Sequence, residues 1–549
     1  MKKNKNKTSN MLKKDYIILG IIVLFYSVLS FINLGSFKNP QTFYKLSKNE
    51  ELTIEFSKYE NINNIKIFNG RKAGSYEVYS SQDNVKYVNQ ASFNDNSEFT
   101  WKEQLFFGQA RYIKLKALKS GYLGDISIYN DKNKLITINN TISSNKKNVG
   151  LDKLFDEKGS VPKAINYLNS MYFDEVYFAR TAYEYSHGIK AYEWVHPPLG
   201  KVIQAIPVKI SNTFAPFYYR FMGNIAGIIM IIVMYLFCKS MFKSTKLSVL
   251  GALIMTFDTF HFAQTRMGTV DSFLVLFIML SYFNMYKYIN SDKTKHLLLS
   301  GLFFGLSVCV KWVGLVAGIG LAIMFFIHII KNKKINIKLL GKASIFFVII
   351  PLILYFGIYM LFPKNINMEM KSIPDIAENS INMYEFHAGI KEWHPFASPW
   401  YSWPISYRPI WLYQGEVDSS GYGTICNIGN IVIWWFSVIT FIYTFIMLFR
   451  RKDKESLLIV CGVLSVWLSP IFVSRFIFLY HYFSVLPFMM LSIVYFFKDL
   501  NKKLNTDMVM YTYIVLFISF FIIYYPVISG IKTNSSYISH LKLLKSWEF

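Results

Sequence analysis

The sequence has little cysteine, little charge and few acidic residues. Its 549 residues include four cysteines, and none of them lies between Phe37 and Lys201. That stretch therefore forms no internal disulfide, and no CxxC spacing suggests a zinc site. Charged residues make up 17% of the chain, whereas 53% are hydrophobic and the mean hydropathy is +0.27. Because ordinary soluble proteins have about 45–50% apolar residues, the composition excludes that class and predicts a polytopic membrane protein.

Basic residues outnumber acidic residues by 59 to 34, which gives a formal net charge of +25. This excess does not predict nucleic-acid binding, because no basic stripe alternates with aromatic residues in a soluble module. The cations instead cluster in short loops between apolar segments, as the positive-inside rule predicts for cytoplasmic loops. These loops are residues 239–246, 331–342, 450–454 and 498–503.

Apolar segments of about 20 residues, the length that crosses a bilayer, recur along the chain. We expect eleven spans, at residues 15–34, 214–238, 247–265, 271–290, 296–311, 312–330, 341–362, 430–449, 456–474, 476–497 and 508–529. The first lacks a small-x-small cleavage site and is interpreted as an uncleaved span. Residues 296–331 count as two spans that turn near Lys311 and Trp312. The loops on both sides of this segment are lysine-rich, so both should be cytoplasmic, and the segment must then cross the membrane twice. The turn also keeps Lys311 out of the middle of the bilayer, where a charge is costly.

This topology places the large non-membrane regions of the chain together on the outer face of the membrane. The expected parts are a cytoplasmic start with the first span (1–34), an outer β-rich insert (40–150), an outer loop with juxtamembrane helices (151–213), spans two to seven (214–362), an outer loop rich in Trp and His (363–429), spans eight to eleven (430–529) and an outer tail (530–549). The polar residues that are candidates for chemistry then all fall on one side.

Residues 40–150 alternate polar and apolar side chains in short runs, separated by Asn, Gly and Ser. Such runs occur at 52–56, 65–68, 76–79, 112–115 and 126–129. The pattern predicts an antiparallel β sandwich. With Trp101 and the closing run 124–129, it resembles the discoidin, or coagulation factor 5/8 type C, jelly roll. Such folds often bind sugars or lipid headgroups, but a spacer or folding module is an equally open interpretation.

Asp174 and Glu175 begin a helix-like stretch and are followed by the rigid turn His-Pro-Pro-Leu-Gly-Lys, which runs from His196 to Lys201. One interpretation is structural: Asp174 caps the helix and Glu175 complements the helix dipole. The other is that the pair supplies a general base at the membrane surface. The neighbouring residues favour the second interpretation. The prolines fix the chain, and Lys201 opens an amphipathic stretch suited to lie on the membrane.

Ionisable residues occur near the outer ends of several spans, where such groups are functional candidates. Arg220 has no acidic neighbour in the sequence and suits a lipid phosphate, which a guanidinium holds through two parallel hydrogen bonds. Arg475, with His481 beyond it, is a second phosphate candidate. Arg266 and Asp271 bracket the entry to another span, and they either serve the site or pair with each other.

The loop 387–411 is rich in Trp and His. The residues concerned are His387, Trp393, His394, Trp400, Trp403 and Trp411. The spacing of the two histidines matches no compact metal-ligand motif. An aromatic wall that faces a sugar or a peptide and an anchor at the membrane interface are both open interpretations.

Together these residues resemble the protein O-mannosyltransferase family, which is glycosyltransferase family 39 of the GT-C superfamily. The resemblance rests on residues 173–178, 195–201, Arg220, 265–266 with 270–272, 310–315, 402–404, and Arg475 with 478–482. It extends over residues 150–549. The chain is similar to the shorter bacterial members, because 363–429 has no room for the β-trefoil domain that eukaryotic members carry there.

The resemblance implies a GT-C fold and an inverting transfer of mannose from a polyprenyl phosphate to Ser or Thr hydroxyls of exported proteins. It implies that Asp174 is the catalytic base and Glu175 its helper. It also implies that Arg220 contacts the carrier phosphate. Arg475, His481 and Lys201 are expected as further donor contacts. Supporting roles are expected for His196, Arg266, Asp271, Lys311, Trp312 and Trp403.

A phosphate leaving group already carries charge, so we expect no required metal or other cofactor, and stimulation by a divalent cation is left open. The expected partners are the polyprenyl-phosphate-mannose donor, an acceptor protein and membrane lipids; an oligomer is left open. One alternative is a GT-C enzyme that uses another sugar or a lipid or cell-wall glycan acceptor. Another is a lipid-linked sugar transporter, which predicts midplane polar residues and internal repeats that the sequence lacks. The expected location is the cell membrane, with the catalytic face extracellular.

Overall fold

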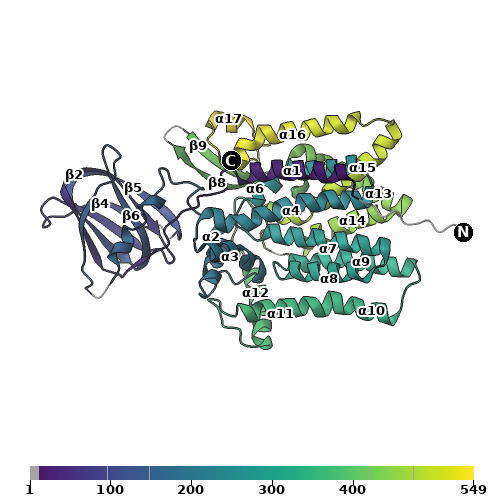
Figure 1. Ribbon diagram of the computed structural model, residues 1–549, viewed down its shortest axis with the longest axis horizontal. Coiled ribbons are helices and arrows are strands. Elements are labelled where there is room, and N and C mark those ends of the chain that lie inside the picture. The colour runs from purple at the N-terminus through teal and green to yellow at the C-terminus, as the bar shows by residue number, and fades with distance from the viewer. Residues whose placement is uncertain (1–10, 95–96, 147–148, 419–420, 474) are drawn as a thin grey trace.

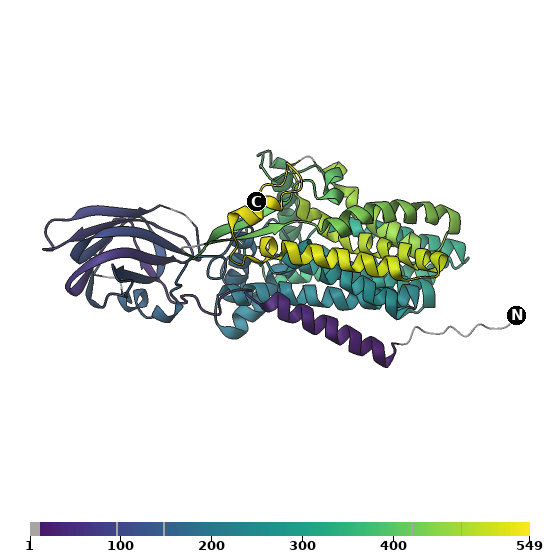
Figure 2. The ribbon, with the colours of Figure 1, turned by 90° about the horizontal axis from the view of Figure 1, so that it is seen from above.

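A computed structural model describes residues 11–94, 97–146, 149–418, 421–473 and 475–549. Long helices run side by side in one bundle, and a separate β domain extends beyond one end of it (Figure 1; Figure 2). The segments that lie at the same end as the β domain are α2 (Glu175–Ser186), α3 (Leu199–Ser211), α12 (Ile373–Gly389) and the hairpin of β8 (Ile410–Asp418) and β9 (Gly421–Asn427) (Figure 1). The regions expected outside the membrane thus gather at one end of the helices.

Within the described residues, the β domain consists of seven antiparallel strands. They are β1 (Tyr44–Leu46), β2 (Glu51–Asn69), β3 (Ser75–Ser81), β4 (Val88–Phe93), β5 (Thr100–Lys119), β6 (Gly121–Asn130) and β7 (Ile138–Ser143). Their order is β1-β6-β2-β5-β3-β4, with β7 paired to β2. The long strand β2 has register shifts, and it pairs with β7 through its first half and with β6 through its second. Such irregularities bend a strand, so one strand serves both parts of the curved sheet.

The core of the β domain is filled by alternate residues of its strands. In β2, Leu52, Ile54 and Phe56 are buried, whereas the residues between them are partly exposed. This is the period-two pattern of a strand with one face on a core. The predicted antiparallel β domain is confirmed, and its likeness to a discoidin jelly roll remains a prediction.

The remaining helices form the bundle and its connections. They are α1 (Lys13–Phe31), α4 (Pro216–Phe242), α5 (Thr245–Thr256), α6 (Thr259–Thr265), α7 (Asp271–Ser291), α8 (Thr294–Val308), α9 (Val313–Lys331), α10 (Ile337–Ser344), α11 (Ile350–Leu361), α13 (Ile431–Arg451), α14 (Lys454–Trp467), α15 (Leu486–Leu504), α16 (Met508–Ser529) and the short α17 (Ser535–His540). A π-helical turn at Ile345–Ile349 joins α10 to α11.

In the part of the chain that the structure describes, eight helical segments are long and apolar enough to cross a membrane. They are α1, α4, α7, α9, α10 with α11, α13, α14 together with the turn that follows it (Lys454–Ile471), and α16. The other three expected spans correspond to α5 with α6, to α8 and to α15. Of these, α5 and α8 are apolar but shorter, and α15 ends in several charged residues. The chain is a multi-pass membrane protein, and the total of eleven spans remains a prediction.

The segment 296–331 is divided between two helices. α8 ends at Val308 and α9 begins at Val313, so the chain turns at the four residues between them. The predicted turn near Lys311 and Trp312 is therefore confirmed. It brings Lys311 to the end of the bundle that carries α2 and the β domain.

Helix α1 lies along the outside of the bundle (Figure 2), and only 28% of its span is buried. Polar contacts hold both of its ends. Near its start, the Asp15 carboxylate accepts a hydrogen bond from Tyr235 at 2.7 Å and pairs with Lys239 at 2.8 Å. At its other end, the Arg266 guanidinium donates to the carbonyl oxygens of Ser30 at 3.0 Å and Ile32 at 2.7 Å.

The β domain packs against α2, the helix that follows the acidic pair. The rings of Phe99, between β4 and β5, and Tyr183 of α2 lie 4.7 Å apart between centroids, within a shared apolar cluster. An ion pair of 3.2 Å joins Glu98 of the β domain to Arg180 of α2. The β domain is thus fixed to the segment that contains Asp174.

Candidate active site

A cavity of about 720 Å³ lies where α2, α12 and the α8–α9 turn meet. Its apolar wall includes Leu274, Val313, Val466 and Pro470, which come from the bundle helices and the turn after α14. Its titratable lining residues are Asp174, Tyr177, Tyr192, Glu193, His196, Asp271, Lys311, Tyr384, His387, Arg475, Tyr480 and His481. Residues far apart in the sequence are therefore collected around one space, whose lining is partly charged and partly apolar.

Asp174 stands at the point where the chain enters α2. The residue before it, Phe173, has a φ of 49°, a left-handed conformation that costs a non-glycine residue about 1–2 kcal/mol. Asp174 occupies the N-cap position, but its side chain accepts no hydrogen bond from an α2 amide. Capping therefore does not explain this residue. Its half-buried carboxylate lines the cavity instead.

The surroundings of Asp174 change its protonation. Burial raises the pKa of its carboxyl to about 7. The ammonium of Lys311 opposes this rise, and the carboxylates of Asp271 and Glu193 add to it. A carboxyl group with a pKa near neutrality exchanges protons readily at physiological pH, which is the property that a general base requires.

Glu175, the neighbour of Asp174, has a different environment. It is fully buried, and its two carboxylate oxygens accept hydrogen bonds from Nε and Nη2 of Arg220, each at 2.7 Å. They also accept the backbone N–H groups of Gly268 at 2.8 Å and Tyr172 at 3.2 Å. Glu175 does not line the cavity. Glu175 is therefore joined to Asp174 through the backbone, and its carboxylate does not reach the cavity.

Arg220 has no acidic neighbour in the sequence, but the fold gives it an acidic partner, Glu175, which lies 45 residues earlier in the chain. The remaining N–H groups of the guanidinium donate to the backbone carbonyls of Leu34 at 2.9 Å, Tyr167 at 2.7 Å and Ser170 at 3.1 Å. All five donors of a guanidinium are thus engaged. In this arrangement Arg220 has no donor left for a phosphate.

Two other cations line the cavity. Lys311 donates to Asp271 at 2.8 Å, and Asp271 also faces the cavity. Arg475 faces it as well, and no carboxylate among the described residues forms an ion pair with it. Asp271 thus pairs with Lys311 and not with Arg266, whose guanidinium is held by carbonyls at the end of α1 and just after it.

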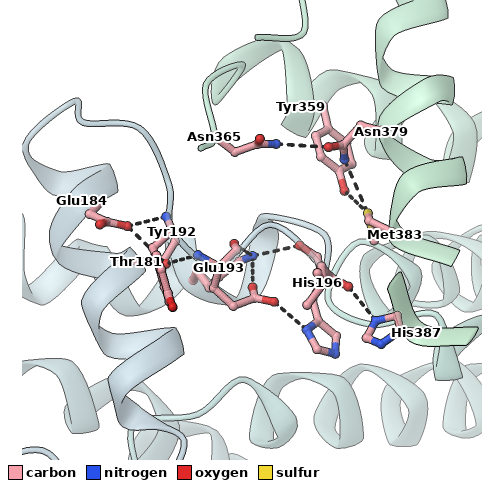
Figure 3. A network of polar contacts seen from close by, with 12 residues as sticks. Thr181, Glu184, Tyr192, Glu193, His196, Tyr359, Asn365, Asn379, Met383 and His387 are labelled. Carbon is pink, nitrogen blue, oxygen red and sulfur yellow. Dashed lines mark hydrogen bonds and ion pairs between the residues drawn. The ribbon is translucent and has the colours of Figure 1, made fainter. Parts of the chain in front are cut away.

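A polar network at the wall of the cavity fixes the loop between α2 and α3 (Figure 3). The Lys201 ammonium pairs with the Glu193 carboxylate and donates to the His196 carbonyl at 2.8 Å. His196 Nδ1 lies 2.8 Å from the same carboxylate. Burial opposes the ionisation of Glu193, but Lys201 and His196 outweigh it and hold its pKa at about 2. Lys201 is buried and does not line the cavity, so this arrangement does not offer it the predicted contact with a donor phosphate.

Two further histidines, His387 and His481, line the cavity. His387 of α12 lies with its ring centroid 5.2 Å from that of His196, and its Nε2 is 2.8 Å from the Val195 carbonyl oxygen (Figure 3). The ring of His481 stacks on Trp403 at 6.0 Å and 12° between planes. Trp403 is itself buried. This tryptophan therefore supports His481 from behind and has no face in the cavity.

Trp312 follows Lys311 at the α8–α9 turn and lines the cavity. Its indole N–H donates to the Tyr355 hydroxyl at 3.3 Å, which ties the turn to α11. Among the described residues, no group of three or more His, Cys, Asp or Glu is arranged to hold a metal ion.

Sequence reasoning did not select Glu193 or the aromatic pair Tyr177 and Tyr192, all of which line the cavity. The sequence contains one indication of the role of Glu193: it precedes His196 by three residues, in a loop where Lys201 needs a counter-ion. Nothing in the spacing of Tyr177 and Tyr192 indicates that their rings meet.

We expect Arg220→Ala to lower the free energy of unfolding by about 3–5 kcal/mol, because it leaves the Glu175 carboxylate buried without a partner. The thermal midpoint of the purified protein measures this loss. Arg111→Ala is the matched control: it removes a partly exposed pair with Glu55 at 3.2 Å and should cost about 1 kcal/mol or less. A double variant, Arg220→Met with Glu175→Leu, should recover part of the loss. An Arg220→Ala protein as stable as the wild type would contradict the structural role.

Comparison with known proteins agrees with this architecture. A sequence model of dolichyl-phosphate-mannose-protein mannosyltransferases matches residues 195–355, and a model of the C-terminal four transmembrane helices of protein O-mannosyltransferases matches residues 372–547. Together the two models span more than half of the chain.

Relatives and solved structures point the same way. A polyprenol-phosphate-mannose–protein mannosyltransferase of Mycobacterium tuberculosis is 21% identical over 453 residues, covering 68% of this chain and 86% of that protein. One of the same name from Corynebacterium glutamicum is 22% identical, covering 64% of this chain and 81% of that protein. The fold is similar to a Saccharomyces cerevisiae protein O-mannosyltransferase, the Pmt1-Pmt2 complex bound to the sugar donor, with a TM-score of 0.61, 14% identity and coverage of 69% and 90%. The chain belongs to the protein O-mannosyltransferase family of glycosyltransferases.

Proposed function

We propose that the protein transfers mannose from a polyprenyl-phosphate carrier to Ser or Thr hydroxyls of exported proteins, with inversion at the anomeric carbon. The names of its relatives support this activity. The observation that carries the proposal is the half-buried carboxylate of Asp174, which shares one cavity with the cations Lys311 and Arg475.

Asp174 is the general base. A Ser or Thr hydroxyl is a weak nucleophile, so its proton must leave as its oxygen attacks the anomeric carbon. The Asp174 carboxylate takes that proton, a bond forms between the hydroxyl oxygen and the sugar, and the bond from the sugar to phosphate breaks. The electron pair of that bond leaves with the phosphate. The pKa of about 7 keeps a substantial fraction of the base ionised at neutral pH.

Arg475 and Lys311 stabilise the phosphate that leaves. Arg475 has a guanidinium that no described carboxylate engages, and Lys311 keeps two of its three donors after binding Asp271. Fixed cations aimed at developing negative charge lower the barrier to reaction. The apolar wall of Leu274, Val313 and Val466 suits the first isoprene units of the carrier. Arg220 supports the site from behind, because its donors are engaged by Glu175 and backbone carbonyls.

The proposed location is the cell membrane, with the cavity on the outer face. The lysine-rich loops between α9 and α10 and between α15 and α16 lie at the other end of the bundle (Figure 1), and such loops favour the cytoplasmic side. We infer no required metal: a phosphate ester leaves with its charge already present, and Arg475 and Lys311 supply positive charge in the cavity.

The activity can be tested with purified protein, polyprenyl-phosphate mannose and a peptide rich in Ser and Thr. We expect the peptide to gain one hexose, detected by mass, with and without a chelator of divalent cations. Transfer to added lipid or cell-wall glycan, with none to the peptide, would reject the proposed acceptor. Absence of any transfer from the donor would reject the proposed reaction.

We expect kcat/KM to rise with pH through about 7 and to level off above it, because only the ionised Asp174 carboxylate accepts a proton. Asp174→Asn should lower kcat by about 10²- to 10⁴-fold and remove this pH dependence. Asp152→Asn, which changes an exposed carboxylate in the same outer loop, is the control and should behave as the wild type. Near-normal transfer by Asp174→Asn would reject the base assignment.

Arg475→Ala should raise the KM for the donor by about 10- to 100-fold, because a hydrogen bond to a charged group contributes about 1.5–3 kcal/mol. Arg475→Lys should restore part of the affinity through charge alone. Arg408→Ala removes another arginine near the same end of the bundle, outside the cavity lining, and should leave donor affinity unchanged. If Arg475→Ala binds the donor as the wild type does, the phosphate contact lies elsewhere.

A further inference from the structure

Two tyrosine rings lie parallel at the cavity beside Asp174. Tyr177 of α2 and Tyr192 of the following loop have ring centroids 6.4 Å apart and an interplanar angle of 4°, which is the geometry of an offset stack. Both line the cavity. Tyr177 is 46% exposed and lies three residues after Asp174, so it stands one helical turn from the proposed base.

The Tyr192 ring is held in place from behind. The guanidinium of Arg180 lies 3.7 Å from the centroid of this ring, a cation–π contact. Arg180 is in turn fixed by Glu184 on α2 and by Glu98 of the β domain, each at 3.2 Å. The β domain therefore contributes one support of the aromatic pair.

The backbone of Tyr192 is fixed as well as its ring. Its N–H donates to Glu184 Oε2 at 2.6 Å, and the next N–H, of Glu193, donates to the Thr181 hydroxyl at 2.9 Å (Figure 3). Both acceptors belong to α2, the helix that also carries Tyr177. The two rings are thus set on one rigid unit. A ligand that stacks on them therefore binds with little loss of conformational entropy in the protein.

The geometry of the reaction indicates what this platform faces. In an inverting displacement the nucleophile and the leaving group lie on opposite sides of the reacting carbon. The cations that line the cavity are Lys311 and Arg475. The phosphate therefore belongs on the side of Arg475 and Lys311. Tyr177 lies in the first turn of α2, directly after Asp174 at its N-cap, and stacks with Tyr192, so the two rings lie on the side where the nucleophile enters.

We infer that Tyr177 and Tyr192 form the binding platform for the acceptor polypeptide, on which planar peptide groups and uncharged side chains beside the reacting hydroxyl stack. This inference rests on the proposed transfer to Ser or Thr. It assigns the acceptor to a surface that the β domain helps to build. The platform positions the hydroxyl near Asp174 and takes no part in bond making.

Steady-state kinetics with the full-length protein separate acceptor binding from the other steps. Tyr177→Ala and Tyr192→Ala should each raise the KM for a Ser/Thr peptide by about 5- to 10-fold, the effect of losing one aromatic contact. The donor KM, and kcat at saturating peptide, should stay within about 2-fold of the wild type, because neither ring touches the proposed phosphate site. Tyr177→Phe should keep wild-type values because it keeps the ring. Tyr59→Ala, which removes a tyrosine that is 51% exposed on the β domain, should have no effect.

Photocrosslinking tests the same inference without a substitution. A peptide with a benzophenone side chain next to its Ser should label the wild-type protein within residues 175–195, and unlabelled peptide should compete. If the wild type does not transfer mannose to the peptide, the proposed function fails. If it does, but Tyr177→Ala leaves the peptide KM unchanged or the label falls elsewhere, the platform is wrong and the proposed function stands.

Discussion

The buried ion pair between Arg220 and Glu175 is the interaction on which the rest of the active-site region depends. One guanidinium joins the end of α1, the loop before the acidic pair, the start of α2 and the second long helix, α4. Two charges taken out of water are stable only when every donor and acceptor is matched, and here they are. Because Glu175 cannot move without breaking this set of bonds, the position of Asp174 beside it is determined too.

The site therefore separates two kinds of charge. Some groups are neutralised by a buried partner, as Glu175 is by Arg220 and Glu193 by Lys201. Others remain available at the surface of the cavity, as Asp174 and Arg475 do. The first kind supplies rigidity and the second supplies chemistry. A membrane enzyme needs both, because a charge near hydrocarbon is tolerated only when it has a partner or a substrate to meet.

Hydropathy and the position of lysines were sufficient to predict the helices, the turn at Lys311 and the gathering of the non-membrane regions at one end. Alternation of side chains was sufficient for the antiparallel β domain. The sequence could not distinguish Arg220 from Arg475, because both are arginines near span ends without a local acid. What distinguishes them is that Arg220 has partners, all of which lie 45 or more residues from it in the sequence. The same limit applies to Tyr177 and Tyr192, whose rings meet only once the loop folds back on α2.

Helix α1 is attached at both ends, through Asp15 at one and the carbonyls that accept from Arg266 and Arg220 at the other, while most of its length faces outward. Its 19 residues rise about 28 Å at 1.5 Å per residue, close to the ~30 Å of a bilayer's hydrocarbon core. A helix tied at both ends cannot tilt freely to follow a thicker or thinner bilayer. Any mismatch is instead transmitted to the attachments, one of which continues through Arg220 to the start of α2. The thickness of the surrounding lipid is thereby mechanically linked to the position of the Asp174 carboxylate, the proposed base.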